Sequence, residues 1–313
     1  MHQTKNNNYI YSVPWDITST FGHGSFKTPY LIPKIMHQLD EAHPFQKRKV
    51  ELVFEPISSV IEELQSRYSC DSQELIQKCN NSIKLSDSDV ELLSLINDAS
   101  RQVNEVVYND TKNLLKTGSV ILCGGEHGIG IGYLKALVEK YSSISILQID
   151  AHMDCREAYF GYEFSHASVM SHYANLPSVK SITQVGIRDY DQAELEFAKQ
   201  STCSFSTFFD YSIHKQLFCG VPWDTITTDI INTLGEHVFI SLDIDGLTPY
   251  LSPSTGTPVP GGIHYNQLIY LFENLYNSKQ IIGAELVEVK GEPLSFDINV
   301  GARICHLLGG LFA

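Results

Sequence analysis

From about residue 119 onward, short apolar runs alternate with longer stretches in which apolar residues recur at helical spacing. The short runs are rich in β-branched residues and are closed by Gly, Asp or Pro, as expected of strands buried on both faces. This alternation is typical of a mostly parallel sheet covered by helices. We predict strands at residues 119–123, 143–149, 181–187, 237–242 and 280–287, and helices at residues 131–140, 191–200, 265–276 and 299–308.

The first hundred residues have a weaker pattern. Residues 9–13 fit an opening strand, residues 60–67 and 90–115 fit helices, and the polar residues 80–88 fit a loop. No internal repeat and no linker rich in Pro or Ser divides the sequence. We therefore expect one three-layer α/β/α domain over residues 1–313, with a mostly parallel central sheet.

Composition narrows the classes of partner. With 43% apolar residues, a chain of 313 residues can bury a large core. Lys and Arg number 22 against 36 Asp and Glu, a formal charge of −14, and no basic run could follow a phosphate backbone. We therefore expect no nucleic-acid partner, whereas a negative field favours the approach of a small cationic substrate.

The cysteines and the apolar runs bear on the compartment. Seven cysteines are scattered without a Cys-x-x-Cys pair, several of them inside apolar runs, which predicts buried reduced thiols. Residues 1–6 are polar where a secretory signal would carry an apolar stretch, and no apolar run is long enough to span a bilayer. We expect a soluble cytoplasmic protein that does not bind membranes.

Acidic residues and histidine gather at two predicted strand ends. The strand at residues 143–149 is followed at once by Asp-Ala-His-Met-Asp. In extended backbone every second side chain points the same way, so Asp150, His152 and Asp154 would converge. A second strand ends in Asp-Ile-Asp at residues 243–245. Open α/β sheets place their ligands at such carboxyl ends of strands.

Four carboxylates and an imidazole at one sheet edge would repel each other and resist burial unless cations neutralised them. Oxygen ligands with some imidazole and no thiolate suit manganese or a similar divalent ion better than a structural zinc site. The surplus of carboxylates permits bridging between two ions, which can lower the pKa of a shared water and make a hydroxide nucleophile. The alternative is that each Asp caps a helix or closes a turn, which is hard to sustain for two such strand ends.

A third predicted strand ends in Gly-Gly-Glu-His at residues 124–127. The paired glycines let the backbone turn sharply and would leave His127 at the carboxyl end of the strand. A lone histidine after such a turn is more often structural than a metal ligand. Because it lies at the third such strand end of one sheet, we favour the interpretation that His127 is a metal ligand.

These motifs resemble those of the ureohydrolases, the family of arginase, agmatinase, guanidinobutyrase and formimidoylglutamase. The resemblance rests on residues 124–127, 150–154, 241–247 and 255–262, in the family's order, and extends from about residue 13 to the end of the sequence. It implies an arginase-like fold and a dimanganese hydrolase that cleaves a guanidino compound to urea and an amine. Agmatine, cleaved to putrescine, or a related agmatine derivative is the expected substrate. Another divalent metal such as nickel is the alternative to manganese.

The resemblance also implies the six ligands of the two ions, and all six are present in this chain. The bridging carboxylates would be Asp150 and Asp243. The further ligands would be His127 and Asp154 for one ion, and His152 and Asp245 for the other.

Two further roles follow from the resemblance. His166 resembles the family's histidine that orients substrate or shuttles a proton, and Glu288, directly after the strand at residues 280–287, resembles the acid that pairs with the guanidinium. A cation held by Glu288 would present its central carbon to the nucleophile, and Asp154 would help to move the proton to the departing amine. The alternatives are a core or loop histidine at position 166 and a charged strand-edge residue at position 288.

The segment after the second motif favours the agmatinase-like branch over arginase. Residues 155–163 lack the Asn- and Thr-rich loop with which arginases bind the α-carboxylate and α-amino group of their substrate. The chain departs from the family pattern at Gly128, Thr248 and Lys290. Thr248 in particular raises the question of how firmly the loop after Asp243 is held.

Two alternative functions stay open from the sequence. One is a sister activity on guanidinobutyrate, guanidine, a formimino compound or an agmatine conjugate, which differs in the substrate tail. The other is a metal-binding pseudoenzyme with a regulatory role, motivated by Gly128 and Thr248. The resemblance further implies a homo-oligomer, either a trimer or a hexamer.

Overall fold

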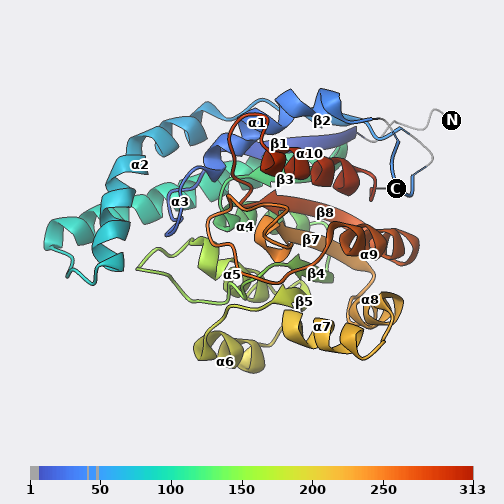
Figure 1. Cartoon of the computed structure of the whole chain (residues 1–313). Helices are drawn as coiled ribbons and strands as arrows, with labels where there is room; N and C mark the ends of the chain where they lie inside the picture. Colours follow the sequence, from blue (N-terminus) through green and yellow to red (C-terminus); the bar gives the residue numbers. More distant parts are fainter. Residues whose placement is uncertain (1–6, 41, 47–48, 313) are drawn as a thin grey trace.

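The computed structural model describes residues 7–40, 42–46 and 49–312, so the polar residues 1–6 considered above lie outside its described part. Within that part, eight parallel strands form one sheet in the order β2-β1-β3-β8-β7-β4-β5-β6 (Figure 1). The strands are β1 Asn7–Val13, β2 Leu52–Phe54, β3 Gly118–Gly124, β4 Ile144–Ile149, β5 Val179–Ile187, β6 Ser204–Phe209, β7 His237–Asp243 and β8 Gln280–Val287. The predicted parallel sheet is confirmed.

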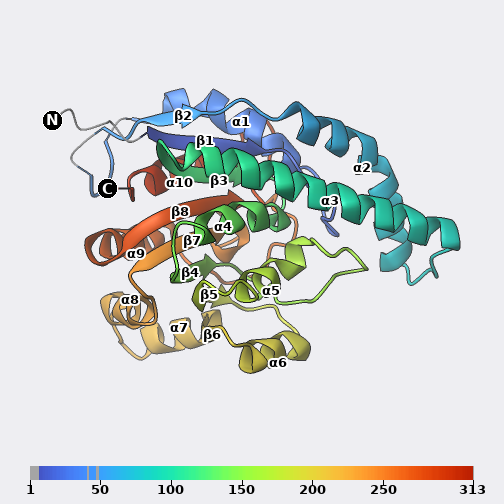
Figure 2. The same ribbon diagram turned by 180° about the vertical axis from the view of Figure 1, so that it is seen from behind.

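Helices cover both faces of the sheet, which confirms the three-layer α/β/α prediction (Figures 1 and 2). The helices on one face are α2 Ser59–Asn80, α3 Asp87–Leu114, α4 Gly130–Val138, α5 Val169–Ala174 and α6 Gln192–Gln200. Those on the other face are α1 Thr28–Ile35, α7 Asp210–Phe218, α8 Trp223–Asn232, α9 Tyr265–Ser278 and α10 Phe296–Gly309.

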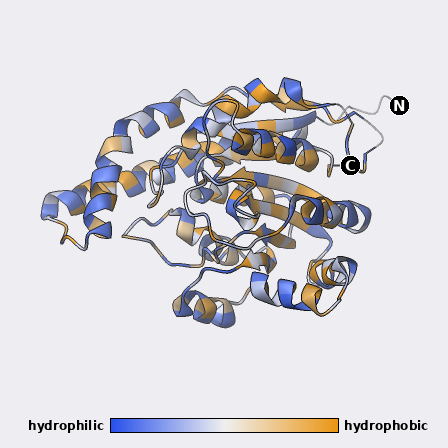
Figure 3. Cartoon of the chain, viewed as in Figure 1, coloured by the Kyte–Doolittle hydropathy of each residue, from blue (hydrophilic) through white to orange (hydrophobic). Residues whose placement is uncertain are grey.

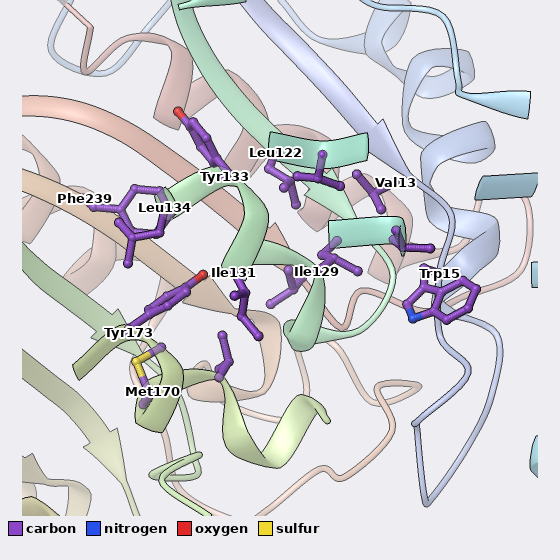
Figure 4. Packing of buried hydrophobic residues seen from close by; sticks show 14 of the residues in the cluster. Val13, Trp15, Leu122, Ile129, Ile131, Tyr133, Leu134, Met170, Tyr173 and Phe239 are labelled. Carbon is purple, nitrogen blue, oxygen red and sulfur yellow. The ribbon is translucent and has the colours of Figure 1, made fainter. Parts of the chain in front are cut away.

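Two apolar clusters, one on each face of the sheet, hold the layers together. Alternation along the strands feeds both clusters: Leu122 of β3 packs on the α3 and α4 side, and Ile121 packs on the α10 side. On the first side, the ring of Phe239 lies 5.4 Å from that of Tyr133 and 6.0 Å from that of Tyr173, centroid to centroid (Figure 4). The helices carry hydrophilic and hydrophobic residues in alternation along their ribbons, as expected of helices that pack one side on a sheet (Figure 3).

The five strands predicted after residue 118 are all present, but several elements were not predicted. The edge strands β2 and β6 are short or rich in polar residues and so have no long apolar run. The helices α1, α5, α7 and α8 were also missed, and the helix predicted at residues 60–67 continues to Asn80 as α2. The predicted loop is confirmed between α2 and α3, where Ser86 and Asp89 form a capping box at the start of α3.

Two cysteines contradict the prediction of buried thiols. Cys70, on α2, and Cys219, directly after α7, are exposed, and Cys79 is partly exposed, whereas the other four are buried. All seven are free. Among the described residues, no helix combines the length and the apolar composition that crossing a membrane requires.

Candidate metal centre

The predicted site residues lie at the carboxyl ends of four neighbouring strands. β3, β8, β7 and β4 are adjacent in the sheet. His127 comes three residues after β3, Glu288 follows β8, Asp243 ends β7 and Asp150 follows β4. The parallel sheet therefore brings all four to one edge, where open α/β sheets carry their ligands.

Turns, rather than extended backbone, bring the acidic side chains together, so the predicted reason for their convergence was wrong. Strand β4 ends at Ile149, and the N–H of His152 donates to Oδ1 of Asp150 at 2.7 Å. After β7, the 3-10 turn Ile244–Gly246 begins with the N–H of Asp245 donating to Oδ1 of Asp243 at 2.9 Å. These Asp side chains thus also close turns, the role considered as the alternative.

The side chains form two clusters that share Asp150. In each cluster, one possible ligand atom per residue lies within 4.8 Å of the others. In the first, Nδ1 of His127 is 2.9 Å from Oδ2 of Asp154 and 3.4 Å from Oδ2 of Asp150. In the second, Nδ1 of His152 is 3.1 Å from Oδ2 of Asp245 and 3.7 Å from Oδ1 of Asp150. Two metal ions bridged by one carboxylate would need such a residue, shared by both clusters.

Asp243 is not a member of either cluster at that distance, although its Oδ2 lies 3.7 Å from Nδ1 of His127. Asp243 is buried and faces the same cavity as Asp245. Its expected role as the second bridging carboxylate therefore stays a prediction, while the position of Asp150 between the clusters agrees with a bridging role.

The hydrogen bonds around His127 leave one ring nitrogen directed at the carboxylates. The Ser241 hydroxyl donates to Oε1 of Glu285 at 2.6 Å, so it can only accept from Nε2 of His127 at 2.7 Å. Nδ1 is buried and faces Oδ2 of Asp154 at 2.9 Å and Oδ2 of Asp150 at 3.4 Å. The two carboxylates would repel a lone pair at this position, so either a second ring proton or a cation must lie between them. The donor set therefore fits a divalent metal ion.

The buried carboxyl groups at this edge of the sheet have too little positive charge around them to be readily ionised. It raises the pKa of Asp154 to about 7, that of Glu288 to about 8 and that of Asp243 well above its usual value. Burial also lowers the pKa of His127, but the carboxylate of Asp150 and its neighbours raise it well above the usual range. A positive charge is thus required beside His127, either a proton or a metal ion.

A cavity of about 250 Å³ lies above the clusters. Its lining includes His152 and Asp154 from the segment after β4, and Asp243 and Asp245 from the end of β7. Glu288 and His166 line the same cavity, whereas His127 and Asp150 are fully buried. The structure thus brings together every residue that the sequence predicted for the site.

Glu288 is held rigidly beside His127. Its N–H donates to the carbonyl of Gly125 at 2.8 Å, and its Oε1 accepts the N–H of His127 at 3.0 Å. Glu288 and Asp154 both have left-handed backbone, with φ of 59° and 54°. Such strained conformations are kept only where the surrounding contacts hold them, and they cluster at functional sites.

His166 begins the 3-10 turn His166–Ser168 and lines the cavity. Its N–H donates to Oγ1 of Thr18 at 3.2 Å, and its Nε2 lies 3.5 Å from Oγ1 of Thr20. Burial, with the positive charge of His152 nearby, lowers the pKa of His166 to about 3. The imidazole is therefore neutral at pH 7.

The sequence interpretation missed Ser241 and Glu285. Glu285 is fully buried inside β8 and accepts hydrogen bonds from the hydroxyls of Tyr173 and Ser241. Through Ser241 it fixes the tautomer of His127. The sequence does contain a sign of this role, because Glu285 stands in the middle of an apolar strand. A buried acid at such a position costs free energy unless it has a partner.

Arg188 was also missed, and it answers the question about the loop after Asp243. Its Nη2 donates to the carbonyls of Asp245 at 2.6 Å and Leu247 at 3.2 Å. The hydroxyl of Thr248 is buried without a partner among the described residues. The loop is therefore held by the arginine and by backbone bonds, not by the side chain at position 248.

The other two departures have structural explanations. A Cβ at Gly128 would collide with the carbonyl oxygen of Phe164, so the glycine permits the close approach of the loop that carries His166. The side chain of Lys290 lies along the loop after β1, since a Cβ at Gly24 would be 3.1 Å from its Cε.

Comparison with protein families and curated proteins gives consistent matches. The profile of the Arginase family matches residues 7–294. The N(1)-aminopropylagmatine ureohydrolase of Thermus thermophilus is 33% identical over 212 residues, which cover 67% of this chain and 69% of that protein. The agmatinase of Pyrococcus horikoshii is 30% identical over 230 residues, which cover 72% of this chain and 75% of that protein.

Solved structures share the fold. A putative agmatinase from Clostridium difficile superposes with a TM-score of 0.70 at 21% identity, over 98% of this chain and 96% of that one. Proclavaminate amidino hydrolase from Streptomyces clavuligerus superposes with a TM-score of 0.72 at 17% identity, over 98% of this chain and 92% of that one.

Proposed function

Because the chain belongs to the arginase family, whose relatives here are named as hydrolases of C–N bonds, we propose that it hydrolyses an amine-tailed guanidino compound to urea and an amine. Agmatine and its aminopropyl derivative are the proposed substrates. The observation that carries the proposal is the pair of His/Asp clusters sharing Asp150 beneath a cavity that Glu288 lines.

The metal ions belong to the proposal. His127, Asp150 and Asp154 would hold one ion, and Asp150, His152 and Asp245 the other, with Asp243 as a second bridge. Carboxylate oxygens with two imidazoles and no thiolate suit manganese, with nickel as the alternative. The chemistry that such ions supply when bound is a lowered pKa of water, which makes a nucleophile available near neutral pH.

Glu288 is proposed to bind the guanidinium. A carboxyl group whose pKa burial raises to about 8 gains its ionised form when a cation arrives, so the bound guanidinium and the carboxylate stabilise each other. The N–H of His127 fixes the orientation of the Glu288 carboxylate. Glu288 therefore holds the substrate carbon above the metal centre.

Two residues are proposed to handle the proton and the substrate orientation. Asp154 takes a proton from the attacking water and passes it to the departing nitrogen. The C–N bond to the tail breaks as the C–O bond forms, so a guanidinium and water give urea and an alkylammonium. His166, which is neutral and lines the same cavity, accepts a hydrogen bond from the substrate.

The outer part of the cavity supports an amine tail. Its lining includes the acids Asp189, Asp191 and Glu194, against the single cation Arg156. Arg156 is paired, with Nη1 2.6 Å from Oδ2 of Asp191 and Nη2 3.7 Å from Oε2 of Glu194. The Asp189 side chain is 68% exposed. The excess of negative charge favours a tail that ends in an ammonium group.

The test is urea release by manganese-loaded protein from agmatine, N1-aminopropylagmatine, arginine, guanidinobutyrate and guanidine, with metal content measured on the same sample. We expect two metal ions per chain and a preference for the two amine-tailed compounds. A preference for guanidinobutyrate or arginine would overturn the proposed tail, and protein with two metals that releases no urea would overturn the activity.

We further propose that the protein is a cytoplasmic homo-oligomer, either a trimer or a hexamer, built from chains that each form one domain. Light scattering after size-exclusion chromatography tests the assembly. A monomer at micromolar concentration would contradict it.

A further inference from the structure

Two loops form part of the wall of the cavity beside the metal centre, and they meet each other. The first, residues 16–24, follows β1 and contributes Thr20 to the cavity. The second, residues 157–166, contributes Tyr159 and His166. Thr20 and His166 come within 3.5 Å of each other, Oγ1 to Nε2. The substrate side of the cavity thus depends on the relative position of two irregular segments.

Helices α2 and α3 form a long antiparallel hairpin that extends past the end of the sheet (Figures 1 and 2). Ser72, fully buried on α2, donates to the carbonyl of Ile17 at 2.5 Å and so must accept from the hydroxyl of Tyr162 at 2.8 Å. Asn80, at the end of α2, donates to the carbonyl of Thr20 at 3.3 Å. One helix therefore binds both loops.

Helix α3 holds the second loop at its hairpin turn. Phe160 and Gly161 have consecutive left-handed backbone, with φ of 51° and 85°. The Nδ2 of Asn97 donates to the carbonyl of Gly161 at 2.9 Å, and its Oδ1 accepts the N–H of Glu163 at 3.0 Å. Asn97 is 8% exposed, so water cannot easily replace these bonds. A single amide thus satisfies one backbone group inside the turn and one directly after it.

We infer that the α2–α3 hairpin positions the substrate wall of the cavity, and that Asn97 is the positioning residue that sets Tyr159 and His166 against the substrate. The inference rests on the proposed function for its kinetic test. The turn closes on itself through two backbone bonds between Tyr159 and Tyr162, at 3.1 and 2.9 Å, so Asn97 fixes where the turn lies and not its internal conformation. Without Asn97 the turn loses its attachment to α3, and both side chains leave their places while the metal centre stays intact.

The test uses two variants of graded severity in the full-length, metal-loaded protein. Asn97→Asp keeps the acceptor for Glu163 but loses the donor to Gly161, and Asn97→Ala loses both. The matched control is Asn109→Asp, on the exposed face of the same helix, where the amide bonds only within the helix to Glu105. Backbone hydrogen exchange, metal content and the kinetics of the preferred substrate are compared.

We expect faster exchange confined to residues 157–166 in both Asn97 variants, with metal content unchanged. Because displacing groups that orient a substrate by about 1 Å can cost about 100-fold, we expect kcat/KM to fall about tenfold in Asn97→Asp and about 100-fold in Asn97→Ala, mainly through KM. The control should match the wild type in all three measurements.

Three outcomes would overturn the inference: unchanged exchange in residues 157–166, faster exchange spread over the whole sheet, or normal kinetics despite a loosened loop. If the wild-type protein cleaves no guanidine, the proposed function has failed, and the exchange data alone decide whether Asn97 positions the loop.

Discussion

Two parts of the cavity are built in different ways: the floor, formed by the residues of the two His/Asp clusters with Asp243, and the wall, formed by the loops at residues 16–24 and 157–166. On the floor, His127, Asp150 and Asp245 lie within three residues of a strand end and are fixed by turns that begin at the sheet. On the wall, His166 belongs to a loop whose conformation depends on Asn97 of a distant hairpin. The backbone of the strands fixes the floor, whereas the wall combines a few backbone bonds within its own loop with side-chain bonds to the hairpin.

This difference separates two properties of the protein. The floor carries the groups that would bind metal ions, and the wall carries the groups that would face the substrate. Changes in the floor should therefore affect metal content and activity together. Changes in the wall at Asn97 should affect substrate use and leave the metal in place, because Asn97 bonds Gly161 and Glu163, which belong to neither cluster.

The most severe break of the floor is Asp150→Ala, which removes the carboxylate that both clusters share. We expect metal content and urea release to fall together, with activity down by a factor of about 1,000 or more, because an unpaired cluster of this kind cannot hold the ions. Metal analysis and a urea assay on one sample measure both.

Asp243→Ala tests the second proposed bridge in the same way, and Asp229→Ala, on the exposed surface of α8, is the control for the substitution. Two tightly bound ions in Asp243→Ala would contradict the bridging role of Asp243. Loss of metal from the control would mean that the assay reports stability instead of ligation.

Glu288→Gln separates metal binding from substrate binding, since Glu288 lies beside the floor but is proposed to bind the substrate. The amide oxygen can still accept the N–H of His127, so metal content should stay at the wild-type value. We expect kcat/KM to fall about 100-fold, because the guanidinium loses its charged partner. Steady-state kinetics with the preferred guanidine measure the loss, and unchanged kinetics would place the guanidinium elsewhere.

Gly128→Ala disturbs the junction between floor and wall. The new Cβ would collide with the carbonyl oxygen of Phe164 and push the loop that carries His166 away from the cavity. We expect stability to fall by about 1–3 kcal/mol from overpacking and KM to rise about tenfold. Denaturant unfolding and kinetics measure the two effects, and a normal KM would show that the loop tolerates the shift.

The smallest expected effect concerns the hairpin itself. The hydrogen bond from Lys78 lowers the pKa of Asp89 from 3.8 to about 2. Because the folded-state pKa is lowered, the stabilisation is present above pH 3.8 and is lost as the pH falls towards 2. Asp89→Asn should be slightly less stable than the wild type at pH 7, and the difference should shrink over that range.

Unfolding midpoints in urea at a series of pH values measure this effect. A difference that stays constant down to pH 2 would mean that Asp89 acts through its cap at the start of α3 and not through its charge.

The sequence was sufficient to predict which strand ends carry the side chains of the site, but not the residues that hold those side chains in place. Asp150 and His127 follow runs of apolar residues, so both the strands and the edge where they end could be predicted from local pattern. Glu285 and Arg188 act through partners far along the chain, and no local pattern indicates which buried acid meets which hydroxyl. The role of Asn97 likewise depends on how α3 packs.

Edge strands and the length of α2 escaped prediction for a related reason. Strand β2 has three residues, and β6, at the edge of the sheet, has three hydroxyl residues among its six. α2 has a low apolar content over much of its length and is helical because it packs along α3. Tertiary packing decides such segments, and their own residues do not.

The last strand of the chain lies in the middle of the sheet, between β3 and β7. Until β8 is in place, the sheet consists of two halves, one that carries His127 and one that carries Asp150 and Asp243. During synthesis on the ribosome, the metal centre therefore cannot close before residues 280–287 emerge. Pairing of parallel strands so far apart in the chain is slow and leaves strand edges exposed meanwhile. We expect newly made chains to need chaperones until this strand is inserted.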